Sequence, residues 1–208
     1  MLGMKMKIPI LMIVVAVVAS CSGRSSNVQT VEHSNMDHSK MQHDDHANMP
    51  SSPGASAAPY DLQFLDTMIA HHQGAIEMAG LAGSRAQHEE LRQLSRNIIT
   101  SQQNEIEKMQ GWRSKWFNNA PPAVNMQFPG MSEGMSGMDL TKLDPLKANA
   151  FDLEFIRQMI PHHEGALAMA KDALAKGSNE EIKSLARQIV EAQEAEITQM
   201  KKWQEEWK

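Results

Sequence analysis

Two adjacent histidines bracketed by methionines occur twice in this chain. The first copy reads Met-Ile-Ala-His-His-Gln-Gly-Ala-Ile-Glu-Met-Ala from residue 68, and the second reads Met-Ile-Pro-His-His-Glu-Gly-Ala-Leu-Ala-Met-Ala from residue 159. Imidazole nitrogen and soft thioether sulfur together favour copper(I), which accepts few ligands, and they also suit silver(I) and, through histidine, copper(II). The candidate ligands in the two copies are Met68, His71, His72, Met78, Met159, His162, His163 and Met169.

Histidine and methionine are also concentrated in two stretches outside these copies. Residues 33–49 hold four histidines and three methionines, a composition that indicates metal binding, although a merely polar linker stays an alternative. Residues 126–138 hold four methionines spaced by Gly and Ser, which predicts either a flexible loop that captures copper(I) or a gap-filling flap over the bundle. The further candidate ligands are His33, Met36, His38, Met41, His43, His46, Met126, Met131, Met135 and Met138.

The elements that must position the two histidine pairs are amphipathic helices. Apolar residues recur at helical spacing, and Pro161 predicts a kink because proline removes a helix hydrogen bond. Asp61 predicts an N-cap, Gly177 a helix end, and Ser178 with Glu181 a capping box. The predicted helices cover residues 61–84, 88–117, 148–176 and 179–207.

The helices fall into two copies of one unit. Residues 61–116 align with residues 152–207 without a gap, with 23 identities in 56 positions. Each copy is a helix hairpin with an apolar face that it cannot bury alone, so two hairpins together predict an all-α four-helix bundle. Pairing of hairpins between chains, which would give a homo-oligomer, stays open.

A helical projection places both histidines of each pair beside the centre of the apolar face. Gln102 and Glu105 lie on the inward stripe of the second helix, roughly level with the first pair, and Gln193 and Glu196 repeat this arrangement. A buried carboxylate is costly unless it is paired, so we expect a polar cluster inside the bundle. Glu105 and Glu196 therefore join the candidate metal ligands.

Other chemistries compete for this cluster. Zinc would use His and Glu but leave the methionines idle, and a di-iron centre would need Glu-x-x-His motifs, which neither pair has. A metal-free network of histidines hydrogen-bonded to Gln and Glu is the third alternative. We see no nucleophile with its base and no nucleotide-binding loop, so an enzyme is not the favoured interpretation.

The N-terminal region predicts export and anchoring. Residues 1–21 combine a basic start, a short apolar run and Val-Ala-Ser-Cys, which resembles a bacterial lipobox with Cys21 as the lipidated residue. Ser22 then mildly favours the outer membrane. Residues 22–60 have the composition of a disordered tether. Without residues 1–21 the chain has 18 basic and 25 acidic side chains, which argues against nucleic acid as a partner.

The second copy also carries a family resemblance. Met159-Ile160-Pro161-His162-His163-Glu164-Gly165-Ala166, preceded by a Phe-Pro-Gly-Met loop, resembles the family called domain of unknown function 305 across residues 61–207. That family is regarded as ferritin-like, and its members include a cyanobacterial periplasmic copper-binding metallochaperone. The resemblance implies a ferritin-like bundle and copper handling; the first copy departs from the motif at Ala70.

These observations predict an envelope lipoprotein that binds copper ions in metal scavenging, chaperoning or tolerance, with other copper-handling envelope proteins as partners. A ferritin-like, metal-dependent redox enzyme and a metal-free helical interaction module are the two rival functions. The predicted organisation is a signal at 1–21, a tether at 22–60, a hairpin at 61–117, a Met-rich linker at 118–147 and a second hairpin at 148–208.

Overall fold

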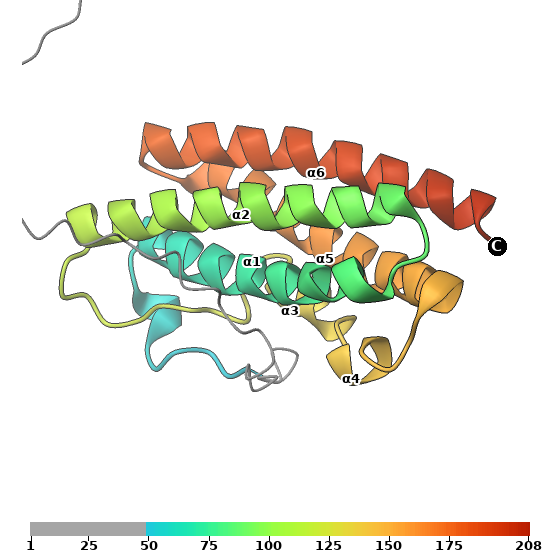
Figure 1. The fold of residues 1–208 in the computed structure, drawn as a ribbon. Helices are drawn as coiled ribbons and strands as arrows, with labels where there is room; N and C mark the ends of the chain where they lie inside the picture. The colour runs from blue at the N-terminus through green and yellow to red at the C-terminus, as the bar shows by residue number, and fades with distance from the viewer. Residues whose placement is uncertain (1–48) are drawn as a thin grey trace, which may run out of the picture. The chain divides into compact units, whose positions relative to one another are not determined.

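The computed structural model describes residues 49–208, and this part of the chain contains helices and no strands (Figure 1). No helix within it combines the length and the apolar character that crossing a membrane requires. The elements are the 3₁₀ turn η3 (Ala55–Ala57), α1 (Tyr60–Arg85), α2 (Glu89–Trp116), α3 (Met131–Ser136), α4 (Leu140–Leu143), α5 (Ala148–Lys176) and α6 (Glu180–Glu206).

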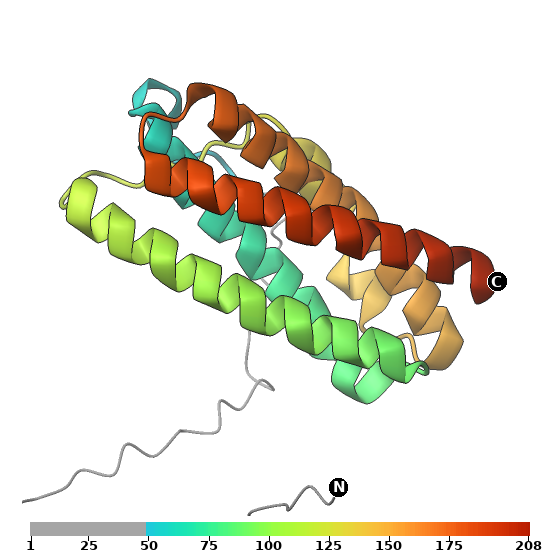
Figure 2. The same ribbon diagram turned by 90° about the horizontal axis from the view of Figure 1, so that it is seen from above.

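The four long helices form a bundle of two hairpins, as the sequence predicts. α1 packs on α2, α5 packs on α6, and α1 packs on α5 across the centre. Figure 1 shows α2 and α6 on one side of the α1–α5 pair, with α3 and α4 on the other side. Figure 2 shows that α2 and α6 run beside each other. Both hairpins of this bundle come from one chain.

The long helices start and end within one residue of the predicted bounds because each buries one apolar stripe. Phe64 on α1 and Phe155 on α5 are fully buried, as are Leu91 and Ile98 on α2 and Ile189 on α6. α5 continues as one helix through Pro161. The bundle therefore presents a single core to the histidine pairs of both copies.

Two predicted helix caps are wrong, and both errors involve the same contact. Asp61 lies in the first turn of α1, after Pro59 at the N-cap position, and it accepts hydrogen bonds from Ser178 N at 3.0 Å and Ser178 Oγ at 2.6 Å. Asn179 caps α6 instead, accepting a bond from Glu181 N. Gly177 does follow the last residue of α5, with φ −57° rather than a left-handed conformation.

The second copy makes the equivalent contact in the opposite direction. Asp152 of α5 is fully buried and accepts bonds from Gln87 N at 3.0 Å, His88 N at 2.9 Å and His88 Nδ1 at 2.7 Å. Each hairpin thus supplies an aspartate that caps the loop of the other hairpin. These reciprocal bonds fix α1 against α5 and so set the relative height of the two histidine pairs.

Two predicted segments contain ordered structure. Residues 49–59 belong to the folded unit rather than to the tether, because Ser52 N donates to Val124 O at 2.8 Å and η3 follows directly. The linker at 118–147 contains α3 and α4, which pack on α5. The signal, the lipobox Cys21 and the tether ligands at residues 33–46 lie outside the described residues.

Candidate metal centre

The two histidine pairs meet in the middle of the bundle. His71 and His72 on α1 and His163 on α5 are 0% exposed, and His162 is 1% exposed. The rings of His71 and His162 lie face to face, with centroids 3.8 Å apart and a 35° tilt between their planes. The sequence left open whether the pairs form one cluster or two, and the structure brings all four imidazoles into one cluster.

A carboxylate holds the outer histidine of each pair. His72 Nε2 lies 2.6 Å from Glu105 Oε2 on α2, and His163 Nε2 lies 2.7 Å from Glu196 Oε2 on α6. The glutamate side chains are 14% and 17% exposed, so the two pairs face the α2–α6 side of the bundle. These contacts confirm the predicted register between the helices of each hairpin.

The cluster contains ring nitrogens without a hydrogen-bond partner among the described residues. They include Nδ1 of His72, Nδ1 of His163 and both ring nitrogens of His71. Burial, and then the charges of His162, His72 and His163, holds the pKa of His71 well below 6.5, with the His162 backbone opposing this shift only in part. His71 is therefore a neutral imidazole at pH 7, the protonation state in which imidazole binds a metal.

The glutamines that the sequence placed beside the glutamates are also buried. Gln102 is 2% exposed and Gln193 is 3% exposed, and the Oε1 atom of each has no hydrogen-bond partner in the described part of the chain. The metal-free network foreseen as an alternative is thus present at the two His–Glu pairs but incomplete around them. Within residues 49–208, no three His, Cys, Asp or Glu side chains form a group that could hold a metal ion. A metal site at the histidine cluster would therefore also need methionine thioethers as ligands.

The predicted methionine ligands fall into two groups. Those of the repeated motif are fully buried on α1 and α5, in the same core as the histidines; they are Met68, Met78, Met159 and Met169. In the Met-rich segment, Met131 and Met135 are 0% exposed, Met138 is 6% exposed, and Met126 is half-buried against the core. Of the two alternatives for this segment, the packing matches the covering flap rather than the flexible loop.

Glycines let α3 approach the histidines. A Cβ added to Gly134 would lie 2.7 Å from His71 Nε2 and 3.2 Å from His162 O, so the backbone of α3 covers this edge of His71. A Cβ on Gly74, in the turn after His71, would lie 3.0 Å from the Met138 sulfur. The sequence shows these glycines and methionines, but it does not show that they cover the histidine cluster.

Comparison with known proteins agrees with this architecture. The family model described as Domain of unknown function (DUF305) matches residues 61–204, which run from the start of α1 to the last turn of α6. The chain belongs to the DUF305 family.

Solved structures similar to this DUF305 chain include CopM in several metal-bound forms. CopM in the Cu(II)-bound form is 42% identical, with a TM-score of 0.63, and the match covers 71% of this chain and 97% of that chain. CopM in the Cu(I)-bound form is 40% identical over 71% of this chain and 96% of that chain, with a TM-score of 0.61. A putative secreted DUF305 protein from Streptomyces coelicolor is 33% identical over 71% of this chain and 92% of that chain, with a TM-score of 0.62.

A curated relative shares a shorter stretch. The uncharacterized protein L153 of Acanthamoeba polyphaga mimivirus is 45% identical over 49 residues, which are 24% of this chain and 32% of that protein. The match therefore spans about a third of the relative's length.

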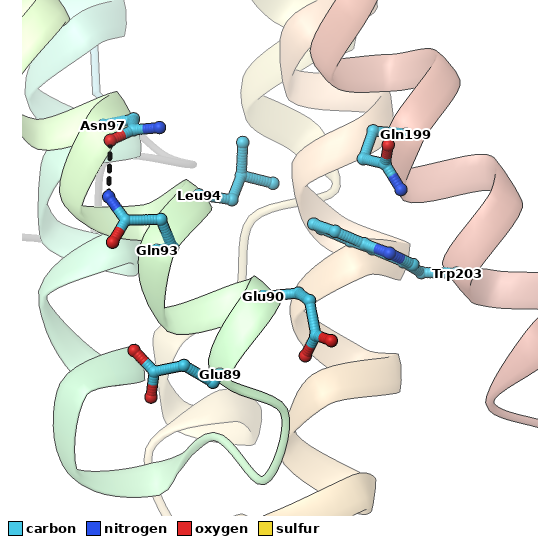
Figure 3. Close-up of a pocket in the computed structure, with 7 residues that line it drawn as sticks. All are labelled: Glu89, Glu90, Gln93, Leu94, Asn97, Gln199 and Trp203. Carbon is cyan, nitrogen blue, oxygen red and sulfur yellow. Dashed lines mark hydrogen bonds between the residues drawn. The ribbon is translucent and has the colours of Figure 1, made fainter.

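A groove in the DUF305 bundle lies apart from the histidine cluster. It has a volume of about 650 Å³ and runs between α2 and α6, where Leu94 and Trp203 face each other (Figure 3). Glu89 at its rim is engaged by Arg92 and Arg96 at 2.7 Å each. None of the predicted metal ligands lines this groove.

Proposed function

We propose that this protein binds copper, with copper(I) preferred, at the cluster of His71, His72, His162 and His163 together with buried methionines of the same two helices, Met68, Met78, Met159 and Met169. The protein would scavenge or chaperone copper in the cell envelope, held there by a lipid on Cys21. Silver(I) and copper(II) are secondary ligands in this proposal.

The burial of His71 without a hydrogen bond carries the proposal. A buried polar group that lacks a partner costs about 1–3 kcal/mol, so a purely structural role predicts a partner for each ring nitrogen. His71 is fully buried, its ring makes only a weak contact with the His162 backbone and no hydrogen bond of normal geometry among the described residues, and its pKa is lowered. A metal ion that coordinates a neutral imidazole supplies the missing interaction.

The ligand chemistry favours a soft monovalent ion. Neutral imidazoles and thioethers bring no negative charge, and the two nearby carboxylates already face His72 and His163. In such a cluster the carboxylates orient the outer imidazoles. CopM, the similar protein described above, has been solved with Cu(I), Cu(II) and silver bound. This likeness supports a soft-metal role for the cluster.

The N-terminal segment supplies the second part of the proposal. The lipobox at Cys21 would anchor the protein to a membrane on the periplasmic side, with the outer membrane favoured by Ser22. The His- and Met-rich residues at 33–49 would concentrate ions near the bundle. Other copper-handling envelope proteins would then deliver copper or receive it.

Copper(I) titration against a competing chelator, without oxygen, tests the bundle site. The full chain is compared with His71→Leu, with the double variant His71→Leu/His162→Leu, and with Glu191→Ala, an exposed change on α6 outside the cluster. We expect the leucine variants to lose at least ten-fold in affinity for the bundle site and Glu191→Ala to keep it. A variant without residues 22–48 separates the tether from the bundle, because it keeps every described contact.

Thermal unfolding of the same variants shows whether the histidines bind metal or only stabilise the fold. Because neither ring nitrogen of His71 makes a hydrogen bond of normal geometry within the described residues, His71→Leu should leave the metal-free protein as stable as the parent or more stable. A ligand that binds the folded state raises the melting temperature, so copper(I) should stabilise the parent and not the double variant. Unchanged affinity in the leucine variants would refute the bundle site, and copper-dependent turnover would favour the redox enzyme instead.

A further inference from the structure

The histidine cluster is closed on both sides, so a metal ion must pass a barrier to reach it. On the α2–α6 side, Glu105 and Glu196 stand against the outer histidines and occupy their Nε2 atoms. On the opposite side, α3 lies across α1 and α5, and Gly134 covers His71 Nε2. The first barrier is made of long helices joined in hairpins, whereas the second is a helix of six residues.

We infer that α3 is a gate that opens to admit the metal ion to His71, with the thioethers of Met135 and Met138 as the ligands that the ion meets first. This inference rests on the proposed copper site for its purpose. The opening of α3 depends only on contacts within the chain, so it can be tested without metal.

The chain is anchored before and after α3, as expected for a helix that moves outward between two fixed points. Before it, Phe128 packs on Tyr60 and Phe64, with ring centroids 5.3 and 6.4 Å away. After it, Asp139 N donates to Gln158 Oε1 at 2.8 Å, and Gln158 Nε2 donates to Asp139 O at 3.1 Å. These contacts anchor the chain on both sides of α3, so the helix can move without displacing α4 or α5.

Glycines stand at both ends of α3 and at its contact with α5. Gly130, just before α3, has a φ of +85°, which glycine adopts without strain. Gly137, just after α3, lies beside Pro161 of α5. A Cβ on Gly165 would lie 2.5 Å from Gly130 O and 2.7 Å from Gly134 Cα. At these glycines the contact between α3 and α5 is therefore backbone against backbone.

The methionines place soft ligands on the path that this motion opens. Met138 Sδ and the Met135 methyl group lie beside Gly74, in the turn of α1 that follows His71. Thioethers bind copper(I) and silver(I) without losing a proton, so an ion can be exchanged from sulfur to imidazole as α3 closes. Met135 and Met138 would thus stand between solvent and the buried nitrogen.

A disulfide between α3 and α5 tests the gate directly. A Cβ on Gly137 would lie 3.9 Å from Pro161 Cβ, within the 3.5–4.5 Å range typical of disulfides. The locked protein is the full chain with Gly137→Cys/Pro161→Cys, and the unlocked control carries Gly137→Ser/Pro161→Ser. Cys21→Ser in both removes the competing thiol, and thiol titration verifies that the disulfide has formed.

The first measurement uses metal-free protein and diethyl pyrocarbonate, which modifies neutral histidines, with each site followed by mass spectrometry. We expect His71 to react at least ten-fold more slowly in the locked protein than in the control, with His88 unchanged. Gly165→Ala should act in the opposite direction, because its Cβ wedges α3 outward, and should speed the reaction of His71. Equal rates at His71 in all three proteins would overturn the gate.

The second measurement follows silver(I) uptake by stopped-flow tryptophan fluorescence, since silver(I) needs no reductant that would break the disulfide. We expect at least ten-fold slower uptake in the locked protein and the same final stoichiometry. If the disulfide slows the labelling of His71 but the protein does not bind silver(I), the metal site is refuted and the gate stands. If the disulfide leaves the labelling rate of His71 unchanged and the protein binds silver(I), the gate is refuted and the metal site stands.

Discussion

Replacing Asp152 with alanine should destabilise the whole bundle, because this carboxylate joins the two hairpins. It is fully buried and accepts hydrogen bonds from Gln87 N, His88 N and His88 Nδ1 at 2.7–3.0 Å. Alanine leaves two backbone N–H groups and an imidazole without their acceptor. The same bonds hold α5 against the α1–α2 loop, so the change acts on the contact that aligns the histidine pairs.

The size of the effect follows from the number of donors that lose their acceptor. Each unsatisfied buried N–H costs about 1–3 kcal/mol, and three donors lose their acceptor here. The His88 side chain is 25% exposed and recovers part of its loss in water, so we expect about 3–4 kcal/mol for Asp152→Ala. For a unit of this size, that corresponds to a fall of roughly 6–16 °C in melting temperature.

Chemical denaturation and calorimetry of the full chain measure this loss. Asp61→Ala is the matched variant; it removes the acceptor of one backbone N–H and one hydroxyl, so it should cost less, about 2–3 kcal/mol. Asp152→Asn keeps one acceptor oxygen and should fall between alanine and the parent. Glu191→Ala, an exposed change on α6, should stay within about 0.5 kcal/mol. If Asp152→Ala costs no more than Glu191→Ala, the reciprocal capping does not hold the hairpins together.

Three further predictions concern the cluster and its cover. Because the pKa of His71 is lowered in the folded protein, the unfolded state takes up more protons below about pH 6.5, so stability should fall as pH falls through that value. Denaturation from pH 8 to 5 should show a smaller loss in His71→Gln than in the parent; equal losses would contradict the buried neutral imidazole. Gly130→Ala combines a φ of +85° with a Cβ only 2.3 Å from a backbone oxygen of α5, whereas Gly54→Ala has a φ of +75° and open space. Denaturation should therefore show a loss of about 1–2 kcal/mol for Gly54→Ala and at least 1 kcal/mol more for Gly130→Ala; similar losses would mean that α3 does not pack closely on α5. Glu105→Gln and Glu196→Gln each remove a carboxylate that orients an imidazole, and each should weaken copper(I) binding roughly ten-fold in the chelator titration. Unchanged copper(I) affinity would show that these carboxylates do not act on the site.

Periodicity predicts the long helices and the inward direction of the histidines because both depend on positions within one helix. Counting residues from the hairpin turn also places Gln102 and Glu105 roughly level with residues 68–72, and the 2.6 Å contact between His72 and Glu105 agrees with that register. The ungapped repeat then gives the second pair, His163 and Glu196, by the same reasoning. These features follow from local spacing, which a sequence states directly.

The caps show where local spacing fails. Asp61 has the residue type of an N-cap, but its acceptor oxygens are used by Ser178, which is 117 residues away in sequence. Rules for helix caps consider a few neighbouring residues, so they assign both residues to the wrong contacts. Only the packing of one hairpin on the other brings these groups together.

The Met-rich segment shows a different failure. Six residues of α3 are too few to display a helical period, and Gly134 looks like a flexible linker residue. In the bundle the same glycine allows a backbone to lie against His71. Glycine here permits close packing rather than flexibility, and the sequence alone does not separate these two uses.

The two copies share one cluster but do not play equivalent parts in it. The His–Glu pairs are nearly identical, at 2.6 and 2.7 Å, so the repeat supplies a symmetric frame for the proposed metal site. α3 occurs once and breaks that symmetry: it covers His71 of the first copy while it rests on Gly165 and Pro161 of the second. Ala70 stands where the second copy has Pro161, so the departure from the repeat lies at the contact with α3. In the proposed site, the frame that would hold the ion therefore stays fixed, and the proposed gate on its asymmetric cover would control access.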